Sequence, residues 1–208
     1  MIELWHCKDS RSLRALWMLE EIGLPYRLHL MTFPPRLSDP SFLGVNVLGT
    51  VPYLIDGQTR MTESCAITQY LATRHGGDLA LAPDEAEYGD WLNWLHHADA
   101  TLTFPQTLVL RYGRFEQRDR RQPQVVEDYT QWFFARLKLV NTRLEGADYL
   151  CAGRFTAADV AVGYALYLAD VIGLGAHLKP QTRAWLDRLT ARPAFQRANA
   201  QGAPLPGV

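Results

Sequence analysis

The sequence has 208 residues, of which 48% are hydrophobic and 21% are charged, a composition close to that of ordinary globular proteins. Its 21 basic and 22 acidic side chains give a formal net charge of -1, which gives no reason to expect nucleic acid or an anionic membrane as a partner. We therefore expect a small-molecule ligand, bound by one large domain or by two small ones.

The N-terminus and the cysteines point to the cytoplasm. Met1 to His6 lacks a basic region followed by a long apolar one, so we expect no secretory signal. The longest apolar stretch, Val160 to Ala169, is too short to span a bilayer and is typical of a buried helix. Three cysteines, Cys7, Cys65 and Cys151, are an odd and sparse set for a disulfide framework. The sequence therefore predicts a cytoplasmic protein.

The first part of the chain alternates between strand-like and helix-like patterns. Apolar spacing predicts a helix that ends at Gly23, and the strands on either side of it form a parallel βαβ pair. Asp56-Gly57 favours a type I′ hairpin, and Ser64 can cap a helix that ends at Gly76-Gly77. The predicted order is β-α-β-loop-β-β-α. The expected strands are Ile2 to His6, Tyr26 to Leu30, Val51 to Ile55 and Gln58 to Met61.

The pattern changes after this first region. From Glu85 onward the apolar residues have helical spacing, and no segment has the alternation of a strand. We therefore predict an α/β domain over residues 1–78, a linker over 79–86 and an all-helical domain over 87–208. The tail from Gly202 to Val208 contains proline and glycine, so we expect it at the surface.

The turn between the first strand and the first helix, Cys7 to Ser12, carries two serines. The carboxyl end of a parallel strand, opening onto a helix N-terminus, is where α/β folds bind ligands and where negative charge is favoured. A serine hydroxyl there can donate a hydrogen bond to a bound thiolate and so lower the pKa of its thiol. The same turn also fits a serine that only caps the helix.

A proline opens the third predicted strand. Pro52 cannot donate to a strand ladder, so it needs an edge or a turn, and X-Pro bonds are the main place where cis geometry occurs. In a cis turn the N–H and C=O of Val51 would point outward and pair with the backbone of a peptide ligand. A trans proline that begins a strand fits the same residues.

Two helix starts carry acidic and hydroxyl residues. Glu63 can accept from an α-ammonium, and Ser64 with the adjacent helix N–H groups can hold a carboxylate, so this pair suits an amino acid head group or a plain capped helix. Thr156 and Asp159 stand in capping-box register ahead of a nearly uncharged helix. We interpret the second pair as structural.

Together, these four motifs resemble those of the soluble, cytosolic-type glutathione transferases, over essentially the whole chain. The stretch His6 to Tyr26 is similar to bacterial members with a catalytic serine, and Asn46 to Pro52 resembles the loop before the family's cis-proline. Glu63 to Ile67 and Phe155 to Asp159 resemble the γ-glutamyl site and the folding motif of the second domain. The resemblance implies an α/β thioredoxin-like N-terminal domain followed by an all-α C-terminal domain.

The resemblance also implies roles for the serine turn. Ser10, four residues before Arg14, would be the catalytic hydroxyl that stabilises the glutathione thiolate, with Ser12 as the alternative. Glutathione would be the co-substrate, and no metal would be needed. The implied reaction is conjugation of the thiolate to a small apolar electrophile.

The remaining glutathione contacts follow in the same way. Val51 would pair with the cysteinyl backbone, Pro52 would be cis, and Glu63 with Ser64 would bind the γ-glutamyl group. Thr50 stands where many family members have lysine, next to the place of the glycyl carboxylate.

The electrophile is expected between the domains, and a homodimer without nucleic acid or membrane partners is implied. Candidate residues for that pocket, which fit a plain core equally well, are Phe104, Leu108, Tyr112 and Tyr164.

Two other functions fit the same scaffold. Cys7 and Ser10 spell C-x-x-S, a spacing compatible with thiol-disulfide exchange, so a glutathione-dependent reductase or peroxidase is one alternative. A non-catalytic protein that binds glutathione or a hydrophobic ligand is the other.

Overall fold

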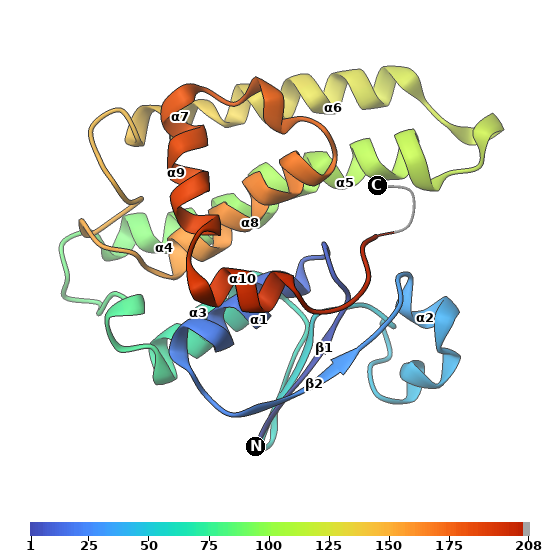
Figure 1. Cartoon of the computed structure of the whole chain (residues 1–208), viewed down its shortest axis with the longest axis horizontal. Helices are drawn as coiled ribbons and strands as arrows, with labels where there is room; N and C mark the ends of the chain where they lie inside the picture. Colours follow the sequence, from blue (N-terminus) through green and yellow to red (C-terminus); the bar gives the residue numbers. More distant parts are fainter. Residues whose placement is uncertain (206–208) are drawn as a thin grey trace. The chain divides into compact units, whose positions relative to one another are not determined.

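The computed structural model describes residues 1–205, which divide into two compact units (Figure 1). Among the described residues, the first unit joins Met1–Ala80 to residues 190–205, and the second comprises Leu81–Leu189. The first contains a small mixed sheet with helices, and the second is helical. The predicted fold class, a thioredoxin-like α/β domain plus an all-α domain, is confirmed.

The sheet of the first unit has the strand order β2-β1-β3-β4. Its strands are β1 (Ile2–His6), β2 (Tyr26–Leu30), β3 (Tyr53–Asp56) and β4 (Thr59–Met61). β1 pairs parallel with β2 and antiparallel with β3, which pairs antiparallel with β4. The β3–β4 turn uses Gly57 at a φ of 57°, a left-handed conformation that glycine adopts without a steric penalty.

Helix α1 (Ser12–Ile22) forms the core of the first unit. Its first eight residues are all buried, and it ends at Gly23 in the left-handed conformation, as the sequence predicts. It packs against α3 (Ser64–His75) and α10 (Pro193–Asn199). The loop after β2 contains the short helix α2 (Pro35–Ser38) and a 3-10 turn over Pro40–Gly44.

Helix α10 corrects the predicted extent of the helical domain. Residues 190–205 belong with the first unit, although the sequence predicts a helical domain over 87–208. Figure 1 shows α10, in red, beside α1, in blue. The indole of Trp17 meets the ring of Phe195 edge-on, with centroids 4.9 Å apart, and Arg192 forms a two-pronged ion pair with Glu21 at 2.6 and 2.8 Å. Helical periodicity shows which face is apolar but not which element covers it.

The predicted surface tail departs from that prediction at one described residue. Ala203 and Pro204 are exposed, but Leu205 is buried, and its N–H donates to the Asp9 carboxylate at 3.2 Å. Near it, a Cβ added at Gly202 would stand 3.5 Å from the Lys8 Cβ. The last part of the predicted tail, residues 206–208, lies outside the described residues. The chain therefore returns to the turn that follows its first strand.

The second unit is built from helices. Its α-helices are α4 (Tyr88–His96), α5 (Phe104–Leu110), α6 (Pro123–Arg136), α7 (Lys138–Arg143), α8 (Ala157–Val171) and α9 (Pro180–Thr190). Segments of π-helix, His97–Thr103 and Arg111–Phe115, follow α4 and α5. Over residues 1–205, every helix is too short or too polar to cross a bilayer.

The predicted capping box begins α8. The Asp159 carboxylate accepts from the Thr156 N–H at 2.9 Å, and the Thr156 hydroxyl accepts from the Ala158 N–H at 3.2 Å. Asp159 also accepts from the Leu150 N–H at 3.1 Å, so it joins the preceding loop to the helix. Burial raises the pKa of Asp159 to about 6. The motif is structural, as its sequence indicates.

Candidate glutathione site

The two serines of the β1–α1 turn (Cys7–Arg11, followed by Ser12) occupy different environments. Ser12 is completely buried, and its hydroxyl lies 2.7 Å from Nδ1 of His6. Ser10 is partly exposed. Its hydroxyl donates to the Cys7 carbonyl at 2.7 Å, lies 2.7 Å from the Ser12 hydroxyl and accepts from the Ser12 N–H at 3.3 Å. Of the two serines, Ser10 is the more accessible residue.

His6 and Cys7 are both withdrawn from solvent. Burial lowers the pKa of His6 to about 4, so the imidazole is neutral at physiological pH. Burial also raises the pKa of the Cys7 thiol to about 12, and the side chain is 2% exposed. A reactive thiolate needs an acidified and accessible cysteine, so the environment of Cys7 opposes the thiol-disulfide alternative.

Ser64 begins α3 but does not cap it. The N-cap is Glu63, which makes no side-chain capping bond. Ser64 is buried, and its hydroxyl accepts from Nη1 of Arg14 at 2.9 Å. The guanidinium of Arg14 is itself completely buried. Glu63 is exposed, so its carboxylate is available to a ligand. Next to it in the chain is the Ser64 hydroxyl, which is hydrogen-bonded to the buried guanidinium of Arg14.

The loop before β3 is held by a side chain. Asn46 is buried, donates to the Thr50 carbonyl at 2.8 Å and accepts from the Leu48 N–H at 3.1 Å. The Val51–Pro52 bond is cis, as the resemblance implies. Thr50 is exposed and Val51 is partly exposed.

These segments meet at one end of the sheet. β1 and β3 run antiparallel, and their recorded pairing ends at Trp5–Tyr53, so the serine turn after β1 and the residues just before β3 lie at the same end. The Arg14–Ser64 hydrogen bond joins the first turn of α1 to the start of α3. The β1–α1 turn, the residues before β3 and the start of α3 can therefore contact one extended ligand.

The candidate electrophile residues have mixed exposure. Phe104 is 52% exposed, and Leu108, one helical turn further along α5, is partly exposed, as is Tyr112. Tyr164 on α8 is 1% exposed. Its burial favours a role in packing.

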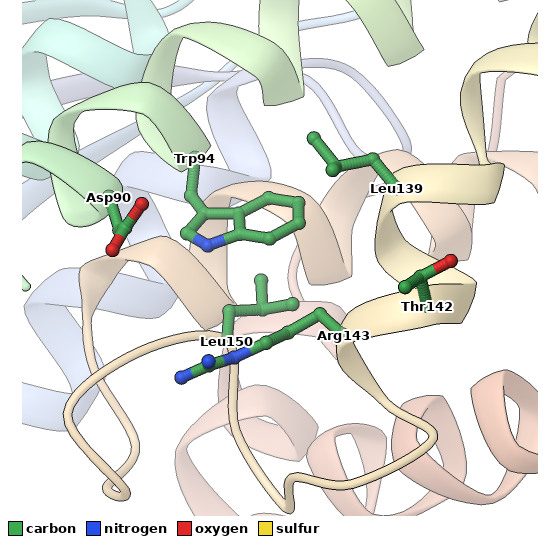
Figure 2. A pocket seen from close by; sticks show the side chains of 6 residues that line it. All are labelled: Asp90, Trp94, Leu139, Thr142, Arg143 and Leu150. Carbon is green, nitrogen blue, oxygen red and sulfur yellow. The ribbon is translucent and has the colours of Figure 1, made fainter.

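A separate pocket of about 230 Å³ lies within the helical unit, and none of those four residues lines it. Figure 2 shows side chains of α4 and α7 converging there with Leu150, which precedes the capping box. The lining residues are Asp90, Trp94, Leu139, Thr142, Arg143 and Leu150.

Sequence reasoning did not assign a role to three residues beside the candidate site. His6 contacts Ser12, Arg14 contacts Ser64, and Asp9 binds the returning chain at Leu205. The burial of His6 could have been predicted from its position in the strand, because it lies on the same strand face as the buried Ile2 and Leu4.

Comparisons with known proteins agree with this architecture. Residues 10–74 match the family model described as the glutathione S-transferase N-terminal domain, and residues 116–189 match that of the glutathione S-transferase C-terminal domain. Glutathione S-transferase F13 of Arabidopsis thaliana is 30% identical over 171 residues, which cover 77% of this chain and 76% of that relative.

Two further relatives span nearly the whole chain. Glutathione S-transferase GstB of Escherichia coli K12 is 26% identical over 201 residues, which cover 95% of this chain and 97% of that protein. The crystal structure of a theta class glutathione S-transferase from Xanthomonas axonopodis pv. citri, with glutathione bound, is 25% identical with a TM-score of 0.80, covering 97% and 98% of the two chains. The chain belongs to the glutathione S-transferase family.

Proposed function

We propose that this chain is a glutathione transferase that joins the glutathione thiolate to an apolar electrophile. The observation that carries the proposal is the partly exposed Ser10 at the end of the sheet where Val51 and Ser64 also lie. A related chain, the Xanthomonas enzyme, has been solved with glutathione bound. Its similarity over nearly the full length supports glutathione as the co-substrate here.

In the proposed complex, each part of glutathione has a chemical partner. The γ-glutamyl group binds at the start of α3, where Glu63 accepts from the ammonium and Ser64 donates to the carboxylate. The buried guanidinium of Arg14 already bonds to the Ser64 hydroxyl oxygen, so the serine proton is free to point to the ligand. The backbone of Val51 pairs with the cysteinyl residue, and the exposed Thr50 stands next to the glycyl end.

Ser10 acts on the sulfur. Its hydroxyl donates a hydrogen bond to the thiolate, and the N-terminus of α1 adds a favourable dipole, so the bound thiol ionises near neutral pH. The sulfur then forms a bond to the electrophilic carbon, and the leaving group departs with its electron pair. The enzyme contributes a lowered thiol pKa and the alignment of the two reactants.

The electrophile and the assembly complete the proposal. Phe104 and Leu108 share a face of α5 and, with Tyr112, supply exposed apolar surface for an aromatic or alkyl electrophile. We also propose that the protein forms a homodimer, and size-exclusion chromatography with light scattering would test this by measuring its molecular mass in solution. Cys7, Cys65 and Cys151 are free thiols, which fits the proposed cytoplasmic location.

The test is turnover of glutathione with a chromogenic aryl chloride. A hydrogen bond to a charged group contributes about 1.5–3 kcal/mol, so Ser10→Ala should lower kcat/KM about 10- to 150-fold and raise the bound thiol pKa by about 1–2 units. Ser41→Ala, at an exposed serine of the same unit, is the matched control and should leave both values unchanged.

Three results would count against the proposal. Glutathione binding without turnover of any electrophile would identify a non-catalytic binding protein. Unchanged kinetics and thiol pKa in Ser10→Ala would remove Ser10 from the mechanism. Loss of a reductase activity in Cys7→Ser, with a mixed disulfide at that residue, would identify the thiol-disulfide alternative.

A further inference from the structure

Behind Ser10 lies a line of short polar contacts that the proposed function does not use. The His6 Nδ1, the Ser12 hydroxyl, the Ser10 hydroxyl and the Cys7 carbonyl are joined by three successive contacts, each 2.7 Å long. We call His6, Ser12 and Ser10 the hydroxyl chain. His6 ends β1, Ser10 lies in the β1–α1 turn and Ser12 begins α1, so the backbone of the first unit holds these three side chains in place.

The number of available protons determines which group donates and which accepts in each contact. A carbonyl has no proton, so Ser10 must supply the one in its contact with Cys7. Ser12 must then supply the proton between the two hydroxyls, and His6 must supply the proton between its Nδ1 and Ser12. If His6 is protonated on Nε2, only the Ser10 and Ser12 protons remain for the three contacts. In one of the contacts, two atoms then face each other through their lone pairs at 2.7 Å. Only the Nδ1–H tautomer supplies a proton to all three 2.7 Å contacts.

The other ring nitrogen of His6 has no well-formed acceptor for a proton. Within residues 1–205, Nε2 has no partner at hydrogen-bond geometry, although the Gln201 backbone lies near the ring, favours its protonated form and competes for the ring proton. A buried N–H without a well-placed acceptor costs more than an unpaired lone pair, which favours the proton on Nδ1. Burial is the largest influence and lowers the pKa of His6 to about 4, so the imidazole is neutral and too weak a base to take the thiol proton.

We infer that His6 is a positioning residue of the glutathione site: its Nδ1–H directs the Ser12 hydroxyl to Ser10, which leaves the Ser10 proton for the bound thiolate. The inference rests on the proposed role of Ser10. When glutathione binds, the Ser10 hydroxyl rotates away from the Cys7 carbonyl so that its proton points to the sulfur, while Ser12 continues to donate to the Ser10 oxygen. A hydroxyl that accepts hydrogen bonds from behind is a stronger donor in front, so the chain strengthens the bond to sulfur.

Ser12 is essential to this arrangement without touching the ligand. It is completely buried, and its oxygen also accepts from the Cys7 N–H at 3.2 Å. With His6 replaced by an apolar side chain, the Ser12 proton can turn to the Cys7 carbonyl, 3.1 Å away. Ser10 then loses the donor behind it.

The first experiment determines the tautomer in the wild-type protein. Nitrogen-15 NMR of the full chain, labelled at histidine, distinguishes Nδ1–H from Nε2–H by the chemical shifts of the two ring nitrogens. We expect His6 to be neutral and protonated on Nδ1. Protonation on Nε2 would overturn the inference, and this result does not depend on glutathione or on the folding of a variant.

The second experiment measures the pKa of the bound glutathione thiol from its ultraviolet thiolate absorbance. His6→Leu removes one neutral hydrogen bond, so the thiol pKa should rise by about 0.4–1 unit. His6→Asn places an amide near the position of Nδ1 and should restore most of the wild-type value. His29→Leu is the matched control, because His29 lies on β2 and stacks on Trp5 outside the hydroxyl chain.

A double substitution shows whether His6 acts through Ser10. In the Ser10→Ala background, His6→Leu should leave the thiol pKa where Ser10→Ala alone puts it. An equal shift with and without Ser10 would assign His6 a general structural role and overturn the inference. If Ser10→Ala alone has no effect, the proposed function fails first and the inference falls with it. If Ser10→Ala raises the pKa and His6→Leu does not, only the inference fails.

Discussion

The contact between Phe195 and Trp17 allows a test of whether α10 stabilises the first unit by packing on α1. Phe195 on α10 is 2% exposed, and its ring meets the completely buried indole of Trp17 at an interplanar angle of 78°. Phe195→Ala removes this ring and leaves a cavity beside α1. Core substitutions of this kind cost about 3–5 kcal/mol, a large part of the roughly 5–15 kcal/mol that stabilises a typical domain.

Two measurements would detect the loss. Urea unfolding should give a lower free energy of unfolding at an unchanged m-value, and hydrogen-deuterium exchange should localise the effect to α1 (Ser12–Ile22). Since about 1.4 kcal/mol is a factor of ten, the protected amides of α1 should exchange about a hundredfold faster or more. Glutathione affinity should fall as well, because α1 carries Arg14 and Ser12.

The control is Phe115→Ala, at a phenylalanine that is 42% exposed in the helical unit. This change should cost less than about 1 kcal/mol and leave exchange from α1 unchanged. The reasoning is refuted if Phe195→Ala costs less than about 1 kcal/mol, or if the exchange of α1 amides is the same as in the wild-type protein.

Three further outcomes follow from other contacts. Asp159→Ala leaves two buried N–H groups without an acceptor but also removes a buried carboxylate, so it should cost about 2–4 kcal/mol in urea unfolding; a cost near zero would contradict the capping role. At pH 8, Cys7 should react with an aromatic disulfide reagent about a thousandfold more slowly than an ordinary thiol, because its raised pKa suppresses the thiolate, whereas the partly exposed Cys65 should be labelled first in peptide mapping. Arg14→Met should raise the Kd for glutathione about tenfold by calorimetry, as should Ser64→Ala, and an unchanged Kd in both correctly folded variants would exclude this pair from the site.

Much of the fold could be predicted because its signals are local. The helix ending at Gly23, the hairpin at Asp56-Gly57 and the capping box at Thr156 and Asp159 each depend on residues within a few positions of one another. Backbone conformations and capping bonds are set at that range. These elements were therefore readable from a single sequence.

The parts that could not be predicted depend on distant contacts. The residues of α10 show a helical pattern, but only the folded chain shows that Phe195 packs on Trp17 in the first unit. Likewise, Ser10 and Ser12 cannot be distinguished by residue type. They differ in solvent exposure, because Ser12 is buried at the start of α1. The sequence predicts that Ser64 caps its helix, whereas its hydroxyl accepts a hydrogen bond from Arg14, fifty positions earlier in the chain.

The return of the chain to its starting point affects the order in which the protein can be made. Residues 1–80 leave the ribosome before the helical unit does, and such a segment ordinarily folds as it emerges. In this protein the partner of Trp17 and the donor to Asp9 are Phe195 and Leu205, which are translated after the helical unit. One side of α1 therefore lacks its packing partner while the helical unit is synthesised, and the first unit is completed only after Phe195 and Leu205 have emerged.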